Sequence, residues 1–321
     1  MADQGHSKVI EEPVHRPMRG IGLKVASVLV FISMAALIKA SSDHIPPGQA
    51  VFFRSLFAIP VIVIWLAWRR ELATGLRTVN PVGHVWRGCM GTMAMGLGFA
   101  GLGYLPLPEV TAIGYAAPLL TVVFAAMFLG EEVRAFRIGA VILGLIGVLI
   151  VLSPRMTALN DGAADTAETL GAVLVLGGAV FAALAQVFVR RLVVQESTSA
   201  IVFWFSLTAT ALSLVTLPFG WVVPAPREAA LLVLAGLLGG LGQILLTSSY
   251  RNADASVVAP FEYVSMLFAL LFGYVFFSEV PSLTMLGGAG LVVIAGMIII
   301  WRERRLGLER AAQRRAMTPQ G

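Results

Sequence analysis

Charged residues are scarce in this chain of 321 residues: they make up 13% of it, and the formal net charge is +5. Soluble domains carry about 25% charged residues. A chain with so few charges cannot cover a water-facing surface, which excludes a soluble enzyme, a nucleic-acid-binding domain and a disordered regulator. The hydrophobic fraction is 58% and the mean hydropathy is +0.85, so we expect a membrane protein.

Cysteine and histidine are also rare. The single cysteine, Cys89, excludes an intramolecular disulfide framework and a cysteine-based metal site. The four histidines fall in predicted tails, loops or helix ends, namely His6, His15, His44 and His84. Neither a metal cluster nor a histidine-based catalytic system can therefore be assembled within the membrane. The sequence also lacks a P-loop. We expect no enzyme activity, no cofactor and no metal.

Long apolar runs, by contrast, fill most of the chain. A membrane helix needs about 20 mostly apolar residues to cross a hydrocarbon core of about 30 Å. The sequence has ten such runs, which lie at 21–40, 48–68, 84–103, 108–129, 136–152, 169–189, 198–217, 229–249, 255–277 and 283–301. The connections between them are short. The predicted fold is an all-α membrane protein with ten transmembrane helices.

Lysine and arginine lie mostly on one side of this arrangement. Only Arg155 and Arg227 fall on the other side, while Lys39, Arg54 and Arg87 lie inside predicted helices or at their edges. The remaining eighteen are Lys8, Arg16, Arg19, Lys24, Arg69, Arg70, Arg77, Arg134, Arg137, Arg190, Arg191, Arg251, Arg302, Arg304, Arg305, Arg310, Arg314 and Arg315. By the positive-inside rule both termini are expected in the cytoplasm. The basic C-terminal tail is expected to contact anionic lipid headgroups rather than nucleic acid.

An internal repeat is found when the chain is shifted by 148 residues. The matched pairs are Tyr115 with Tyr263, Phe124 with Phe272, Phe128 with Phe276, Glu131 with Glu279 and Gly139 with Gly287. Among residues 115–150, nine positions are identical to their counterparts. The predicted helices 84–103 and 229–249 are also the glycine-rich members of their halves. The chain is therefore predicted to consist of two five-helix repeats.

Because five is odd, the second repeat must enter the membrane with the opposite orientation to the first. Inverted repeats of this kind build secondary transporters, in which two bundles give alternating access to a site near the midplane. The predicted organisation is a cytoplasmic tail 1–19, a first repeat 20–153, an outer loop 154–168, a second repeat 169–302 and a basic cytoplasmic tail 303–321.

Two stretches of the sequence resemble a known family. GYAAP at 114–118 leads to GE at 130–131, and DASVVAPFEY at 254–263 leads to SEVP at 278–281. With the two five-helix halves, these stretches resemble the EamA branch of the drug/metabolite transporter superfamily over residues 20–302. The resemblance implies a single-chain inner-membrane carrier with a central cavity between its halves. It does not fix the cargo, because similar members export amino acids and other metabolites or import compounds such as S-adenosylmethionine or riboflavin.

Ionisable groups inside a membrane are costly, by about 2.5 to 3.5 kcal/mol on insertion scales, and are candidates for function. Glu262 is the first of them, because it lies about seven residues into the predicted helix 255–277, roughly 10 Å from the cytoplasmic end. A carboxyl at this depth is expected to exchange protons as a coupling residue or to face a cationic substrate group. The alternative is a structural hydrogen bond between helices.

Two prolines interrupt corresponding predicted helices. Pro118 and Pro260 each remove an amide donor and free a carbonyl four residues earlier. Interrupted helices at corresponding positions of two repeats point to a transporter binding site. Tyr115 and Tyr263 would present phenol groups beside these hinges, one from each half. The alternative is that the prolines are ordinary kinks and that the tyrosines fill space.

Four further residues are candidates for substrate contact. Arg54 would bind an anionic substrate group or, as we prefer, pair with Glu109. Gln186 and Gln243 would line the cavity or bridge helices. Trp204 would stack on a planar substrate or mark the membrane interface.

Other charged residues are given structural roles. We expect Lys39 and Arg87 to reach the interface with extended side chains, and Glu131 and Glu279 to support the bends between helices.

The sequence therefore predicts an inner-membrane secondary transporter of a small organic metabolite, working by alternating access and coupled to protons or to exchange. The cargo would be an amino acid or a derivative, or a compound like S-adenosylmethionine or a vitamin. Its partners would be this small molecule and the lipid bilayer, and a homodimer stays open. The alternative is a channel or a non-transporting membrane scaffold subunit.

Overall fold

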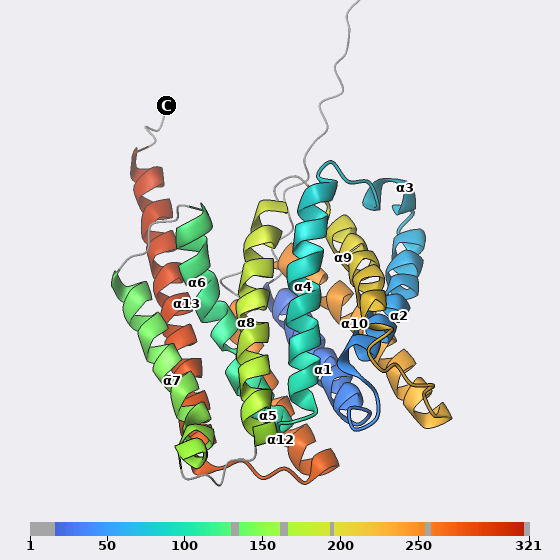
Figure 1. Cartoon of the computed structure of the whole chain (residues 1–321). Coiled ribbons are helices and arrows are strands. Elements are labelled where there is room, and N and C mark those ends of the chain that lie inside the picture. Colours follow the sequence, from blue (N-terminus) through green and yellow to red (C-terminus); the bar gives the residue numbers. More distant parts are fainter. Residues whose placement is uncertain (1–16, 130–134, 161–165, 193–195, 254–257, 318–321) are drawn as a thin grey trace, which may run out of the picture.

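The computed structural model describes residues 17–129, 135–160, 166–192, 196–253 and 258–317, and every element in these ranges is a helix. The all-α prediction is confirmed for the described part of the chain. The longer helices run side by side as one bundle (Figure 1).

The elements follow in chain order. They are α1 (Pro17–Lys39), α2 (Pro47–Trp68), α3 (Leu72–Gly75), α4 (Pro81–Leu102), α5 (Leu107–Gly114), α6 (Ala116–Leu129), α7 (Ala135–Asn160), α8 (Thr166–Leu192), α9 (Thr198–Ser213), the 3-10 helix η1 (Leu214–Thr216), α10 (Pro226–Asn252), the 3-10 helix η2 (Ala259–Tyr263), α12 (Val264–Phe277) and α13 (Leu283–Met317).

Seven helical segments are long and apolar enough to cross a membrane. They are Pro17–Lys39, Pro47–Trp68, Leu107–Phe128, Thr166–Val189, Ser199–Thr216, Pro226–Ser249 and Leu283–Arg302. Two shorter apolar helices, Ile138–Pro154 and Phe261–Phe277, match two further predicted spans. The one predicted span not yet accounted for, 84–103, corresponds to α4, in which several glycines and Arg87 lower the mean hydropathy. The count of ten spans, the inversion of the second half and the position of the termini stay predictions.

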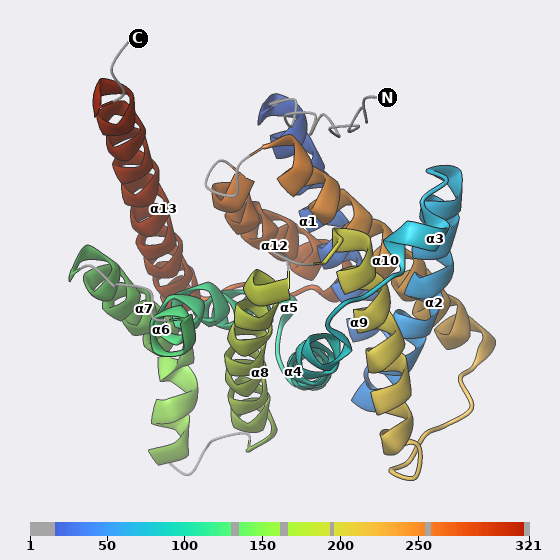
Figure 2. The same cartoon turned by 90° about the horizontal axis from the view of Figure 1, so that it is seen from above.

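Helices of the two predicted halves are interleaved. α1 packs along α10, α4 packs along α8, and α7 packs along α13. Seen from above, α6, α7 and α13 lie at one side of the bundle and α2, α9 and α10 at the other (Figure 2). α3 and the C-terminal end of α13 lie at the same end of the bundle (Figure 1). That end is cytoplasmic in the predicted orientation.

Glycines allow the closest of these contacts. A Cβ built on Gly147 of α7 would lie 2.8 Å from the carbonyl oxygen of Gly288 on α13, and one on Gly288 would lie 2.7 Å from the carbonyl oxygen of Gly147. On α10, a Cβ at Gly236 would lie 2.9 Å from the carbonyl oxygen of Phe53. Small residues at such crossings let helix backbones approach within a membrane.

The buried apolar residues form two main clusters. The first joins α5, α6, α7, α8, α12 and α13 and includes Tyr115, Leu119, Val148, Met285 and Val292. The second joins α1, α2, α4, α10 and α12 and includes Ile38, Val51, Phe99, Leu232 and Ala269. Of the candidate residues, Tyr115 belongs to the first cluster and Tyr263 packs against it.

Candidate functional site

Both tyrosines lie where a membrane helix is broken. Tyr115 separates α5 from α6, and Tyr263 ends η2 directly before α12. α6 and α12 each have 14 residues, and their first residues, Ala116 and Val264, are as far apart in sequence as the two tyrosines. Each break therefore recurs at the matching position of the predicted repeat.

The two prolines lie beside these breaks. Pro118 is in the first turn of α6, and Pro260 is at the start of η2. The first turn of a helix has amide groups without intrahelical acceptors, so proline is tolerated there. Both prolines thus begin a new helical segment rather than bend a continuous one. Ser256, whose carbonyl Pro260 would free, lies outside the described residues.

The structure brings Tyr115 and Tyr263 into direct contact. Their ring centroids are 5.0 Å apart and the ring planes are 68° apart. The Tyr115 hydroxyl is 2.6 Å from Ser265 Oγ, and Ser265 Oγ donates to the carbonyl oxygen of Glu262 at 2.7 Å. The Tyr263 ring lies against Gly296 of α13, where a Cβ would overlap the phenol oxygen. The pair is therefore a packed contact between the two predicted halves.

Glu262 forms an ion pair with Lys24 of α1. The Lys24 side chain is 2% exposed, whereas the Glu262 side chain is 46% exposed. A buried ammonium group needs a counter-charge, because its desolvation is otherwise uncompensated. The cationic group that faces Glu262 in this structure is therefore the protein's own Lys24. The sequence analysis counted Lys24 among the cytoplasmic charges and missed this role, although Lys24 lies inside the first apolar run.

Arg54 is buried in the centre of the bundle, with 3% of its surface exposed. Its Nε and Nη1 atoms have no hydrogen-bond partner among the described residues, so these atoms do not make the preferred pairing with Glu109. Arg87 does not extend to the membrane interface either: its Nε and Nη1 are buried and likewise unpartnered within the described chain. The expectation for Arg87 was wrong because its guanidinium group packs on Phe205 of α9, with Cζ 3.5 Å from the ring centroid.

The other sequence candidates lie apart from the tyrosine pair. Gln186 is exposed on α8. The Trp204 indole donates to the carbonyl oxygen of Leu76 at 3.1 Å, which ties α9 to the segment after α3. In the part of the chain that the structure describes, no hydrogen bond or ring contact joins these two residues to Tyr115 or Tyr263.

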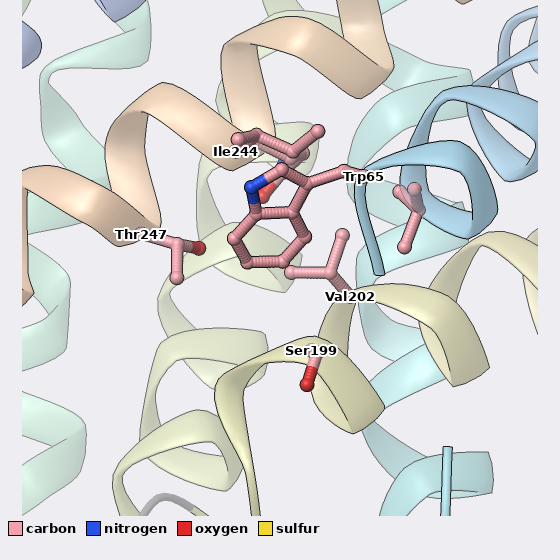
Figure 3. Close-up of a pocket in the computed structure, with 7 residues that line it drawn as sticks. Trp65, Ser199, Val202, Ile244 and Thr247 are labelled. Carbon is pink, nitrogen blue, oxygen red and sulfur yellow. The ribbon is translucent and has the colours of Figure 1, made fainter. Parts of the chain in front are cut away.

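Gln243 lines a small pocket between α2, α9 and α10. Figure 3 shows the Trp65 indole in this pocket among Ile244, Thr247 and Val202. The cavity volume is about 10 Å³, which is about the space that one water molecule needs. The pocket as it stands is too small for a metabolite.

A larger pocket lies at the opposite end of the bundle from α3. Its volume is about 370 Å³, within the range of about 300 to 1,000 Å³ typical of small-molecule sites. The loop after α1, the first turn of α2 and the end of α4 line it, and Asp43 and Tyr104 are among its polar residues. In the predicted orientation this pocket opens on the outer side.

Lys39 and Glu279 form an ion pair near this larger pocket, with Nζ and Oε1 3.1 Å apart. Lys39 also donates to the carbonyl oxygens of Leu102 and Leu105, and Glu279 accepts from the amide of Leu107 at 2.9 Å. The expectation that Lys39 extends its side chain to the membrane interface was therefore wrong, because this side chain is only 14% exposed. The supporting role expected for Glu279 at a bend is confirmed. Its counterpart Glu131 lies outside the described residues.

Glu196 organises the opposite end of the bundle. Its Oε1 accepts from Thr78 Oγ1 at 2.6 Å and from the amides of Val79 and Asn80, both at 2.8 Å. Burial acts to raise the pKa of Glu196, but these hydrogen bonds outweigh burial and hold the pKa below its ordinary value. Glu196 thus fixes the segment that precedes α4, and α4 carries Arg87. The sequence analysis gave no signal for it.

Comparison with known proteins gives a consistent picture. A model described as the EamA-like transporter family matches residues 18–153 and 169–301. The pseudopaline exporter of Pseudomonas aeruginosa is 33% identical over 280 residues, which cover 86% of this chain and 94% of that protein.

The S-adenosylmethionine uptake transporter of Rickettsia bellii is 27% identical over 286 residues, which cover 89% of this chain and 94% of that protein. A solved crystal structure has the same fold with a TM-score of 0.63 at 22% identity, covering 89% of this chain and 98% of the other.

Proposed function

This chain belongs to the EamA-like transporter family, and we propose that it is an inner-membrane secondary transporter that carries a small organic metabolite by alternating access. Its relatives include an exporter and an uptake transporter. The proposed cargo is an amino acid or a derivative, or a compound like S-adenosylmethionine or a vitamin.

The observation that carries this proposal is the contact of Tyr115 with Tyr263 at two matching helix breaks. Two repeats related by a two-fold axis bring equivalent residues together at that axis, as in any symmetric pair. The helix packing supports the same relation. In the proposed repeats α1, α4 and α7 are equivalent to α8, α10 and α13. Exchanging equivalent helices turns the packed pair α1–α10 into the packed pair α8–α4, and it turns α7–α13 into the same pair.

The proposed repeats are residues 20–153 and 169–302, joined by the loop 154–168 and flanked by the tails 1–19 and 303–321. The two stretches that match the family model support this division, because their bounds differ from the proposed ones by no more than two residues. In alternating access one repeat moves against the other. We place the hinges at the breaks beside Pro118 and Pro260.

Glu262 is the proposed coupling residue. It is half-exposed and lies next to the break, while its partner Lys24 is buried on α1. Protonation of the carboxylate, or binding of a charged cargo group, would compete with the ion pair and so would change how α1 is held against η2. Occupancy of the site would in this way be linked to the relative position of the helices.

The test is counterflow in proteoliposomes that contain the full chain. A carrier shows saturable uptake of a labelled compound, and an excess of unlabelled compound on the far side stimulates it. S-adenosylmethionine and labelled amino acids are the first probes. Ion conduction without saturation and without stimulation from the far side would instead support the channel alternative.

The matched variants are Glu262→Gln and Glu71→Gln. Glu71 is exposed and pairs only with its neighbour Arg69 among the ion pairs of the described chain. Glu262→Gln is expected to insert normally and to reduce counterflow strongly, whereas Glu71→Gln retains it. Full activity of Glu262→Gln at several pH values would remove Glu262 from the mechanism.

A further inference from the structure

Three neighbouring helices carry buried polar atoms that lack a partner in the described chain, and two of these side chains are arginines that face one aromatic ring. Among the described residues, seven buried polar atoms on α2, α4 and α9 have no hydrogen-bond partner: Arg54 Nε and Nη1, Ser55 Oγ, Arg87 Nε and Nη1, Thr92 Oγ1 and Ser206 Oγ. α2 packs on α9, and α4 packs on both. Buried polar atoms are normally paired, so a set of orphaned donors needs an explanation such as an absent ion or ligand.

Phe205 holds the two arginines together. The Arg87 Cζ atom is 3.5 Å from the ring centroid of Phe205 and the Arg54 Cζ atom is 5.7 Å from it. The ring offsets part of the desolvation of each cation through its π face. It offers no lone pair to the guanidinium N–H groups. Both arginines are thus positioned by the ring, while their Nε and Nη1 atoms have no acceptor among the described residues.

Two glycines make room for these side chains. A Cβ on Gly239 of α10 would lie 3.0 Å from Arg54 Nε, and a Cβ on Gly91 of α4 would lie 3.0 Å from Arg87 Nη1 and 2.7 Å from the Phe205 ring. A larger residue would crowd Arg54 at the first position and both Phe205 and Arg87 at the second. The space occupied by the guanidinium groups is therefore built by four helices.

The cluster lies well inside the membrane region. Arg54 is seven residues from the first residue of α2, and Arg87 is six from that of α4. At about 1.5 Å per residue each is roughly 10 Å from a helix end, and in the predicted orientation these two ends face opposite sides of the membrane.

No described carboxylate forms an ion pair with either arginine. Two like charges buried side by side without counter-charge destabilise the empty protein, because both are desolvated and they repel each other.

We infer that the Arg54–Arg87 cluster binds an oxyanion that is part of the transported molecule, so that the cargo carries a carboxylate or a phosphate group. The arginine guanidinium matches such a group because its planar N–H donors can bind two oxygens at once. This inference rests on the proposed function, and it names the cargo class that the carrier accepts.

The first experiment measures the melting temperature (Tm) of the full chain in detergent. Succinate and glutarate are compared with succinamide, glutaramide and sodium chloride at equal ionic strength and pH. A ligand that binds only the folded state raises Tm. We expect at least one acid to raise Tm above its neutral counterpart. If no acid does so, the inference is wrong.

The variants Arg54→Gln and Arg87→Gln separate a binding role from a structural one. Each removes an uncompensated buried charge, so the empty variants should melt at or above the temperature of the unchanged protein and should lose the acid-dependent shift, with affinity reduced about tenfold or more. The control Arg69→Gln, at an exposed ion pair, should keep the shift. Variants that melt lower and keep the shift would overturn the inference.

The origin of the oxyanion is tested with inorganic phosphate and sulfate. If either raises Tm as much as the best organic acid does, and that acid shows no counterflow, the site binds a free inorganic anion and the assignment to the cargo is wrong. If the organic acid raises Tm and exchanges across the membrane, the assignment holds.

Counterflow keeps the two proposals distinguishable. If a cationic or neutral probe shows saturable exchange but no acid shifts Tm, the proposed carrier function is supported and the proposed anionic cargo is wrong. An acid-dependent shift lost in both arginine variants, with no exchange of that acid, would keep the anion site and remove its assignment to the cargo; the carrier is removed only if no probe shows saturable exchange.

Discussion

Lys24 and Glu262 form an ion pair across 238 residues of sequence, which joins the first helix of the chain to the break before α12. The two side chains differ sharply in exposure, because the lysine is buried and the carboxylate is half-exposed. Loss of the carboxylate therefore removes a counter-charge from a buried cation, whereas loss of the lysine removes a counter-charge from an accessible carboxylate.

The first prediction follows from this asymmetry. Glu262→Gln should lower Tm more than Lys24→Met does. Its loss in free energy of unfolding should be smaller than the roughly 3 to 5 kcal/mol lost when a fully buried pair is broken, because the carboxylate is half-exposed. The double variant should be more stable than Glu262→Gln, since the buried charge is then removed together with the counter-charge. Thermal unfolding of the four proteins in detergent checks this. Equal losses in both single variants would contradict it.

The tyrosine pair gives a second prediction. Tyr115→Phe removes the hydroxyl that contacts Ser265 Oγ and should cost about 1 kcal/mol of stability, the usual net value of a hydrogen bond. Tyr263→Phe should cost less, because no hydrogen bond of its hydroxyl is found within the described chain. Both variants should weaken cargo affinity in counterflow if the hinge region belongs to the site. Unchanged affinity in both would count against this.

A third prediction concerns pH and Glu196. Its pKa is held below the ordinary value of 4.5, so its ionised form stabilises the folded protein. That contribution is complete above the ordinary pKa and is lost as pH falls through the lowered one. The Tm difference between the unchanged protein and Glu196→Gln should therefore be greatest near neutral pH and should shrink as the pH falls below the ordinary value of 4.5. A difference that grows on acidification would refute this sign.

Glycine substitutions give a fourth prediction. Gly239→Ala places a methyl group 3.0 Å from Arg54 Nε, so it should shift that side chain and weaken oxyanion binding while the protein still folds. Gly290→Ala on α13 is the control, because a Cβ there meets nothing within 4 Å. The control should be neutral or gain about 0.5 to 1 kcal/mol from the better helix propensity of alanine. Equal oxyanion affinity in the two variants would show that Gly239 does not shape the site.

The sequence predicted the parts of the site that depend on local pattern. Apolar runs located the helices, and the repeat at an offset of 148 residues placed Tyr115 and Tyr263 at equivalent positions, where they are in contact. Glu262 was identified because a carboxylate inside an apolar run is unusual. These features needed only composition, spacing and self-similarity.

The remaining parts depend on which helix lies beside which, and spacing along the chain does not encode that. Lys24 was assigned to the cytoplasmic side because its partner is on a distant helix. Arg87 was expected to extend to the interface because Phe205, the ring that holds it, belongs to α9. Glu196 went unnoticed since its donors lie in a segment without a motif.

The backbone contact of α7 with α13 at Gly147 and Gly288 limits how the protein can move. Two helices that touch through their main chains have no side-chain layer that could yield, so they neither approach nor slide without losing the contact. The crossing of α10 on α2 at Gly236 is of the same kind. In the proposed alternating access each of these two pairs would then move as one body, and the change of access would have to come from movement between the pairs.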